Sequence, residues 1–258
     1  MSIFSHTPDS LVKLGKQPPK YDPHTLKLAR YVDLTAAPTP PAETQRAVGM
    51  SWPMFANDRL GDCTLAGMAH MIEFWMARSN DQNDHFTITD DNVVSAYSAV
   101  SGYNPQTGEN DNGAVELEVL KWWQTVGIAG HQISAYAAVN LPNHDLVRLA
   151  AWMFDGLYIG VALPASAQGK AEWDYLPETG SQSYPGTWGG HCVNVVDYNA
   201  TGPVVITWGA PKQMTWDFWD HYCDEAYAII SPEELTGTGR TVEGFDASAL
   251  LSDLERIR

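Results

Sequence analysis

The sequence predicts an α+β protein, because segments with helical periodicity come first and segments with strand character follow from residue 157 onward. Runs of helices followed by runs of strands are typical of this class and differ from the regular alternation of α/β folds. The length of 258 residues and a hydrophobic content of 44% allow a substantial core, and ten tryptophans argue against disorder. The change of character near Gly156 divides the predicted domain into two lobes.

The predicted organisation is an N-terminal arm over residues 1–50 and one domain over residues 51–258. Within that domain we expect a helical lobe over 51–156 and a strand-rich lobe over 157–237. Many of the sixteen prolines lie in the arm. They predict an extended segment with one short turn of helix near His24–Tyr31.

Four helices are predicted before the strands, and one after them. Leu65, Met68 and Ile72 share one face of the first helix at helical spacing. Thr89 and Asn143 are N-cap residues of the second and fourth. The predicted helices are Cys63–Ser79, Asp90–Val100, Gly113–Val126, His144–Phe154 and Ala247–Ile257.

Four strands are predicted in the second half, from short runs rich in β-branched and aromatic residues. They are Leu157–Leu163, His191–Tyr198, Val204–Trp208 and Glu225–Ile230. A long loop, Pro164–Gly190, separates the first two, and Thr215–Tyr222 forms an aromatic loop or a short helix before the last. A further short helix is expected to start at Ser231.

Charge and composition exclude several classes of function. The net charge is −16, and it is uneven: residues 1–60 carry seven Lys or Arg against five Asp or Glu, so the arm is expected to lie across an acidic body. Such a body binds nucleic acid and anionic membranes poorly. No run of about 18 apolar residues or secretory signal occurs, and three cysteines do not form a disulfide framework. We therefore expect a cytoplasmic or particle-associated protein with reduced thiols.

Neither a cofactor nor a metal site is expected from the sequence. The run His221-Tyr222-Cys223-Asp224 contains metal-ligating residue types, but no second Cys/His pair lies near it. Cys192 follows a histidine on a predicted strand and is expected to point into the core.

Cys63 stands where the turn-like segment Asn57–Asp62 meets the first predicted helix. Free N–H groups and the helix dipole stabilise a thiolate at such a position, although a single cysteine is more often a buried structural thiol. His191 lies 128 residues later, at the start of a buried strand and after two glycines. Wide separation in sequence with adjacency in the fold is typical of a Cys/His nucleophile pair.

Together these residues resemble the papain-like cysteine peptidase superfamily, in the order in which that family carries them from Trp52 to Ile230. The resemblance rests on Asn57 six residues before Cys63, Asp111-Asn112-Gly113, Gly189-Gly190-His191 and Trp208-Gly209. It implies a two-lobed fold with a helical N-terminal lobe, an antiparallel β-rich C-terminal lobe and the site in the cleft between them.

The resemblance also implies roles for individual residues. Cys63 would be the nucleophile and His191 the base, together as a thiolate–imidazolium pair, and Asn57 would be a donor in the oxyanion hole, where the family has glutamine. The residues implied to line the substrate groove are Asn112, Gly113, Gly190 and Trp208.

The sequence departs from the family pattern in two places. Leu60-Gly61-Asp62-Cys63-Thr64 replaces the usual Cys-Gly-Ser-Cys-Trp, and Ile206 stands where an asparagine normally orients the histidine. Thr207, one residue later, could orient His191 only weakly through its hydroxyl. The arm is too short for the family's full prodomain, and we expect it to cover part of the groove without acting as an inhibitor.

The resemblance implies a thiol-dependent hydrolase, a cysteine peptidase that cleaves peptide or protein substrates. Two alternatives remain open. One is a Cys-dependent acyl transferase, similar to a transglutaminase or a peptide ligase. The other is a catalytically inactive papain-like protein that serves in binding or as a structural component of a particle.

Overall fold

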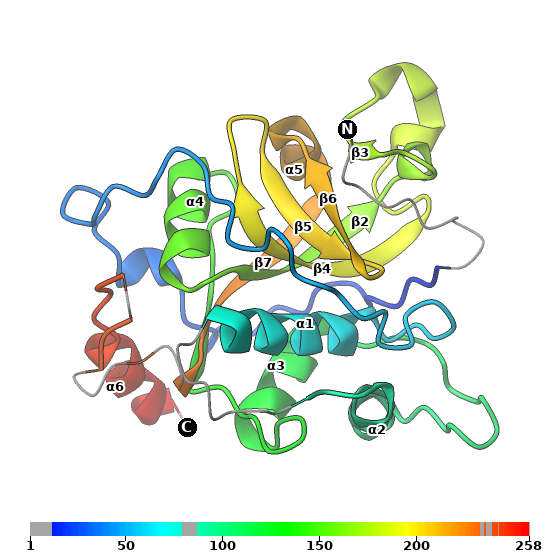
Figure 1. The fold of residues 1–258 in the computed structure, drawn as a ribbon, viewed down its shortest axis with the longest axis horizontal. Coiled ribbons are helices and arrows are strands. Elements are labelled where there is room, and N and C mark those ends of the chain that lie inside the picture. Colours follow the sequence, from blue (N-terminus) through cyan, green and yellow to red (C-terminus); the bar gives the residue numbers. More distant parts are fainter. Residues whose placement is uncertain (1–11, 79–86, 233–234, 236–238, 242, 258) are drawn as a thin grey trace.

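The computed structural model describes residues 12–78, 87–232, 235, 239–241 and 243–257. They form the predicted α+β fold, in which one twisted sheet packs against a layer of helices (Figure 1). The helix α1 (Cys63–Arg78) lies directly against the sheet, with α2 (Asp90–Ser101) and α3 (Glu116–Thr125) beyond it.

The remaining helices are α4 (His144–Met153), α5 (Trp216–Tyr222) and α6 (Ser248–Ile257). Both predicted N-caps are confirmed: the side chain of Thr89 accepts a hydrogen bond from Asn92 N, and that of Asn143 from Leu146 N. The aromatic segment before the last strand is the helix α5. The predicted end of the first helix at Ser79 lies outside the described residues.

The sheet has seven strands among the described residues, in the order β1-β7-β2-β4-β5-β6-β3. Neighbours are antiparallel except β3 and β6, which are parallel. The strands are β1 (Ala135–Ala138), β2 (Leu157–Leu163), β3 (Glu172–Trp173), β4 (Gly189–Tyr198), β5 (Pro203–Thr207), β6 (Ala210–Met214) and β7 (Cys223–Ile230).

Three of these strands, β1, β3 and β6, were not among those expected from the sequence. β1 falls inside the segment predicted as the helical lobe, yet it pairs with β7 at the sheet edge. The long loop before β4 contains β3 and two short 3-10 helices, Ala165–Ala167 and Pro177–Ser183. The short helix expected at Ser231 falls partly outside the described residues.

The core fixes the start of α1 against β4. Leu65, Met68 and Ile72 are fully buried, as their spacing predicts. The two elements approach closely at Gly67, where an added Cβ would lie 3.1 Å from Cys192 Sγ. None of the described helices has the length and apolar character needed to cross a bilayer.

The described part of the arm runs extended over the surface of the domain (Figure 1). It includes a single 3-10 turn at Leu28–Arg30, inside the range predicted for a turn of helix. The backbone of the arm bonds to the domain at several points, including Ala138 N to Leu26 O at 2.8 Å and Thr44 N to Tyr198 O at 2.9 Å. These contacts agree with an arm that lies across the body.

Candidate active site

Cys63 is the first residue of α1 and only 1% of its surface is exposed. The backbone N–H of Cys192, on β4, donates a hydrogen bond to Cys63 Sγ at 3.4 Å. The start of β4, which carries His191, therefore lies directly against the thiol. The structure brings together two residues that are 128 positions apart in the sequence.

His191 is held on two sides. Its Nε2 lies 2.8 Å from the hydroxyl of Thr207 on β5, and its ring stacks on Trp208 with centroids 4.3 Å apart. Nδ1 has no hydrogen-bond partner among the described residues. Ile206 is buried in a separate apolar cluster with Trp52 and Phe74. Thr207 thus occupies the orienting position, and one ring nitrogen of His191 stays available.

Burial sets the protonation states of both groups. It raises the pKa of the Cys63 thiol to about 12, and backbone hydrogen bonds from Cys192 and Gly15 oppose that shift only in part. Burial also lowers the pKa of His191 to about 3. In this covered arrangement Cys63 is therefore a neutral thiol and His191 a neutral imidazole, and not the thiolate–imidazolium pair that the resemblance implies.

Asn57 is buried in the turn before α1, close to Cys63, but its amide N–H groups are engaged there. Nδ2 donates to Leu60 O at 3.0 Å and to Asp62 Oδ1 at 3.2 Å. In this arrangement Asn57 therefore holds the turn and the buried Asp62 carboxyl, and it presents no free donor for an oxyanion. Burial raises the pKa of Asp62 well above its usual range, which favours the neutral acid next to Cys63.

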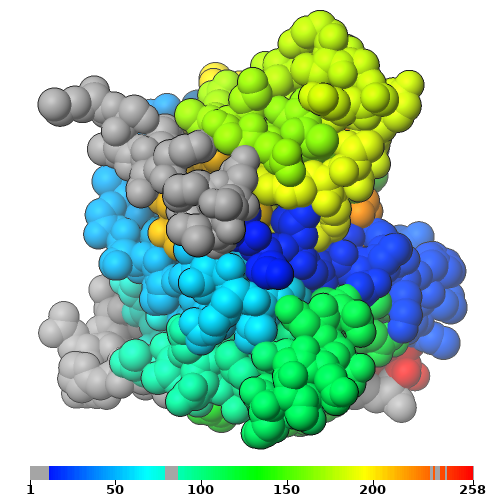
Figure 2. Space-filling model, turned by 90° about the vertical axis from the view of Figure 1, so that its right-hand side faces the viewer, coloured from blue at the N-terminus to red at the C-terminus, as the bar shows by residue number. Residues whose placement is uncertain are grey.

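The predicted groove residues Asn112, Gly113, Gly190 and Trp208 all contact, or lie next to residues that contact, the N-terminal arm. We call residues 12–17 the cleft segment, and the cleft is the space that it fills between Gly61 and Gly113 on one side and Gly189 and Gly190 on the other. Figure 2 shows the segment in dark blue between the two halves of the molecule.

Backbone hydrogen bonds attach the cleft segment to both walls. Lys16 N donates to Gly190 O at 3.1 Å, and Gln17 N donates to Ala114 O at 2.9 Å. Trp208 Nε1 donates to Lys13 O at 3.0 Å, and the side chain of Gln17 donates to Asn112 O. The segment therefore fills the predicted groove beside Cys63 and Gly190.

The cleft segment fits because both it and the walls carry glycine at the points of closest approach. A Cβ on Gly15 would lie 1.7 Å from Gly61 O, and one on Gly113 would lie 1.7 Å from Gly15 O. A Cβ on Gly190 would lie 2.2 Å from Lys16 O. No side chain can be accommodated at these distances, so the seating of the segment depends on Gly15.

Nothing in the neighbouring residues indicates the roles of Gly15 and Lys16, because the partners of both lie far away in the sequence. Lys16 Nζ lies 2.9 Å from Asp224 and 3.1 Å from Glu225, both more than 200 residues away. The expectation that the arm covers part of the groove fits this geometry. The expectation that it is no inhibitor stays a prediction; the Gly15 backbone lies against Cys63, which is 1% exposed.

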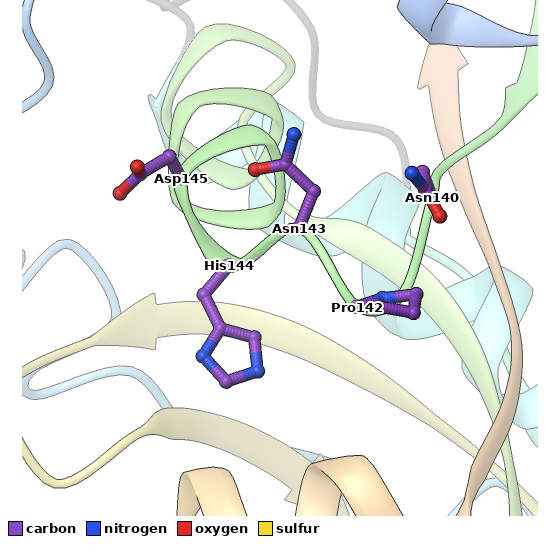
Figure 3. Close-up of a pocket in the computed structure, with 5 residues that line it drawn as sticks. All are labelled: Asn140, Pro142, Asn143, His144 and Asp145. Atoms are coloured by element: carbon purple, nitrogen blue, oxygen red, sulfur yellow. The ribbon is translucent and has the colours of Figure 1, made fainter.

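A second hollow lies on the surface at the start of α4 (Figure 3). It is lined by Asn140, Pro142, Asn143, His144 and Asp145. It shares no residue with the cleft. The described residues also include no group of three His, Cys, Asp or Glu side chains placed to hold a metal ion.

Comparison with solved structures shows a papain-like fold. Xylellain, a cysteine protease from Xylella fastidiosa, matches with a TM-score of 0.66 and 15% identity, over 86% of this chain and 97% of that one. A digestive procathepsin L 3 from Tenebrio molitor larval midgut matches with a TM-score of 0.58 and 13% identity, over 86% and 77%. The Carica candamarcensis cysteine protease CMS1MS2 in complex with E-64 matches with a TM-score of 0.52 and 13% identity, over 74% and 99%. No family model matches the sequence, and no curated protein does.

Proposed function

We propose that the protein is a thiol-dependent hydrolase of the papain-like kind, a cysteine peptidase that is latent while the cleft segment is seated. The observation that carries the proposal is the arrangement at β4: Cys192 N–H bonds to Cys63 Sγ, and the neighbouring His191 is fixed by Thr207 with its second nitrogen unpartnered. A thiol and an oriented imidazole at a helix start are the parts that nucleophilic catalysis by cysteine needs.

The chemistry follows from those two groups. When the cleft segment leaves, water reaches both groups, and the burial that keeps the pair neutral is removed. His191 then takes the thiol proton, and the Cys63 sulfur bonds to the substrate carbonyl carbon. The amine leaves with that proton, and water hydrolyses the thioester, releasing the acid and restoring the thiol. The backbone N–H of Cys63 is the proposed oxyanion donor.

We propose that Asn112, Gly113, Gly190 and Trp208 line the substrate groove, because these residues or their neighbours contact the cleft segment in this structure. The cleft segment takes its backbone bonds from the Gly113–Ala114 and Gly190 walls and from Trp208, and a peptide substrate would use the same groups. Peptides or proteins are therefore the proposed substrates. No contact of the described residues favours the alternative of a Cys-dependent acyl transferase over a hydrolase.

Alkylation of Cys63 in the full chain tests this proposal. Gly15→Ala should dislodge the cleft segment without altering the domain, since its new methyl group meets Gly61 O. We expect iodoacetamide to label Cys63 at pH 7 about 10³-fold faster in this variant than in the wild type, because lowering the thiol pKa by about three units raises the thiolate fraction by that factor.

Lys13→Ala is the matched control, because that side chain is exposed and the substitution leaves the backbone of the cleft segment free to seat. Labelling is read by mass spectrometry, with Cys192 and Cys223 as internal references. If Cys63 in Gly15→Ala is no more reactive than those two thiols, the catalytic proposal fails. A fluorogenic peptide with and without added amine then separates hydrolysis from acyl transfer.

A further inference from the structure

The side chain of Lys16 enters a pocket of its own beside the thiol. The side chain is 1% exposed, and its ammonium group makes ion pairs with Asp224 at 2.9 Å and Glu225 at 3.1 Å. Its backbone is bonded to Gly190, which immediately precedes His191. We call this the Lys16 pocket; its walls are Glu116, Gly160, Asp224 and Glu225.

Gly160 on β2 makes the room for the lysine stem. A Cβ at that position would lie 2.0 Å from Lys16 Cε, 2.7 Å from Asp224 Oδ1 and 2.8 Å from Glu225 Cγ. The residues paired with Gly160 on the neighbouring strands, Cys192 and Glu225, both carry side chains. Because Gly160 has none, a hole remains in the sheet surface at this position.

The pocket gathers three acidic side chains, Glu116, Asp224 and Glu225, around one ammonium group. Burial raises the pKa of Glu116 well above its usual range, which favours the neutral acid there. Glu116, at the start of α3, is fully buried, and its carboxyl oxygens accept no hydrogen bond from an N–H or O–H group of the described residues. Burial alone would lower the pKa of Lys16, yet the carboxylates of Glu116, Glu225 and Asp224 together raise it. The carboxylates therefore outweigh the cost of burying the ammonium group.

Departure of the cleft segment would leave these carboxyls without a cation. Buried carboxylates without a partner are costly, and a long side chain ending in a positive charge is what restores the balance. Lys16 enters the pocket from the cleft, where its backbone N–H is bonded to Gly190 O.

Resting on the proposed function, we propose that the Lys16 pocket selects peptide substrates that carry a lysine or arginine side chain. In the latent protein Lys16 occupies the place of that substrate side chain. Arginine suits the pocket as well as lysine, because its guanidinium group can bond to two carboxylates at once.

Binding is tested first, because it does not depend on catalysis. The probe is a labelled synthetic peptide with the sequence of residues 12–20, and its partner has norleucine in place of Lys16, with the same carbon stem but no charge. With full-length Gly15→Ala protein we expect the lysine peptide to bind at least tenfold more tightly by fluorescence anisotropy, as charge-assisted hydrogen bonds predict.

Variants of the pocket residues test whether the Lys16 pocket causes the preference for the lysine peptide. Asp224→Asn combined with Glu225→Gln should abolish the difference between the two peptides, and Gly160→Ala should weaken binding of both by filling the hole. Asp217→Asn is the matched control, since it removes an exposed acidic charge on α5, outside the pocket. Equal binding of the two peptides to the Gly15→Ala protein would overturn the proposal.

Hydrolysis is tested second, with fluorogenic tetrapeptides that carry Arg, Lys, norleucine or Glu at each position in turn. We expect one position at which Arg and Lys are cleaved at least tenfold faster than norleucine. If peptides are cleaved with no such position, the pocket proposal is wrong while the peptidase proposal stands. If Cys63 does not label and no peptide is cleaved, the peptidase proposal fails, and so does the proposal that the Lys16 pocket selects substrates.

Discussion

The arm is attached to the domain at two places by different chemistry. In the cleft, residues 12–17 are held by backbone hydrogen bonds, by glycine contacts and by one buried lysine. Around residue 46, the carboxylate of Asp197 accepts hydrogen bonds from Arg46 N at 2.7 Å and Ala47 N at 2.9 Å. The Arg46 guanidinium reaches Asp155, Trp152 O and Glu243.

The two attachments differ in what their loss would do to the molecule. The attachment at Arg46 joins charges that lie far from the thiol, and its loss would expose nothing catalytic. The attachment in the cleft covers Cys63, and a single methyl group on Gly15 is enough to prevent it. We interpret the first as part of the fold and the second as reversible, and three measurements test that division.

The largest expected effect is on the pH dependence of Cys63 alkylation. With the segment seated, burial raises the thiol pKa to about 12, so the thiolate fraction and the labelling rate should rise about tenfold per pH unit from pH 7 to pH 10. In Gly15→Ala the rate should level off near the ordinary thiol pKa. A wild-type profile that levels off at that same pH would mean that the seated segment does not control the thiol.

The next effect concerns stability. Asp197→Ala removes a buried acceptor from two backbone N–H groups, and we expect the free energy of unfolding to fall by about 3 kcal/mol. Urea denaturation measures it, with Asp197→Asn as the milder substitution. Labelling of Cys63 under native conditions should not change, and an increase like that of Gly15→Ala would show that the two attachments are coupled.

The smallest effect is at the orienting residue. In the Gly15→Ala background, Thr207→Val removes the hydroxyl that bonds to His191 Nε2, and we expect the rate of peptide hydrolysis to fall about tenfold, as the loss of one hydrogen bond predicts. Thr207→Ser keeps the hydroxyl and should restore most of the rate. If Thr207→Val leaves the rate unchanged, Trp208 alone is sufficient to hold the imidazole.

Much of the fold could be predicted from local sequence, because its main elements bury regular apolar patterns. The strand Leu157–Leu163 has the predicted bounds, and α1 begins at Cys63 as expected. The strand Ala135–Ala138 could not be predicted, because its Ala-Tyr-Ala-Ala sequence favours no strand by itself. It is a strand only because β7 and Leu26 supply partners for its backbone.

The candidate residues of the site could be chosen from the sequence, but their hydrogen bonds and ion pairs could not. Cys63 and His191 stand out because each occupies a recognisable position at the start of an element. The hydrogen bonds of Asn57 could not be predicted from its position alone, since Leu60 and Asp62 take its donors in the folded turn. The ion pairs of Lys16 could not be predicted, because its partners Asp224 and Glu225 lie at the other end of the chain and only folding brings them together.

The burial of Cys63 has a consequence for the chemical lifetime of the protein. Peroxides attack thiolates that are open to solvent, and successive oxidation ends in acids that no longer act as nucleophiles. A thiol that is 1% exposed, with its pKa raised to about 12, presents almost no such target. On the proposed function, the six residues of the cleft segment would therefore also preserve the sulfur in its reduced form until the cleft opens.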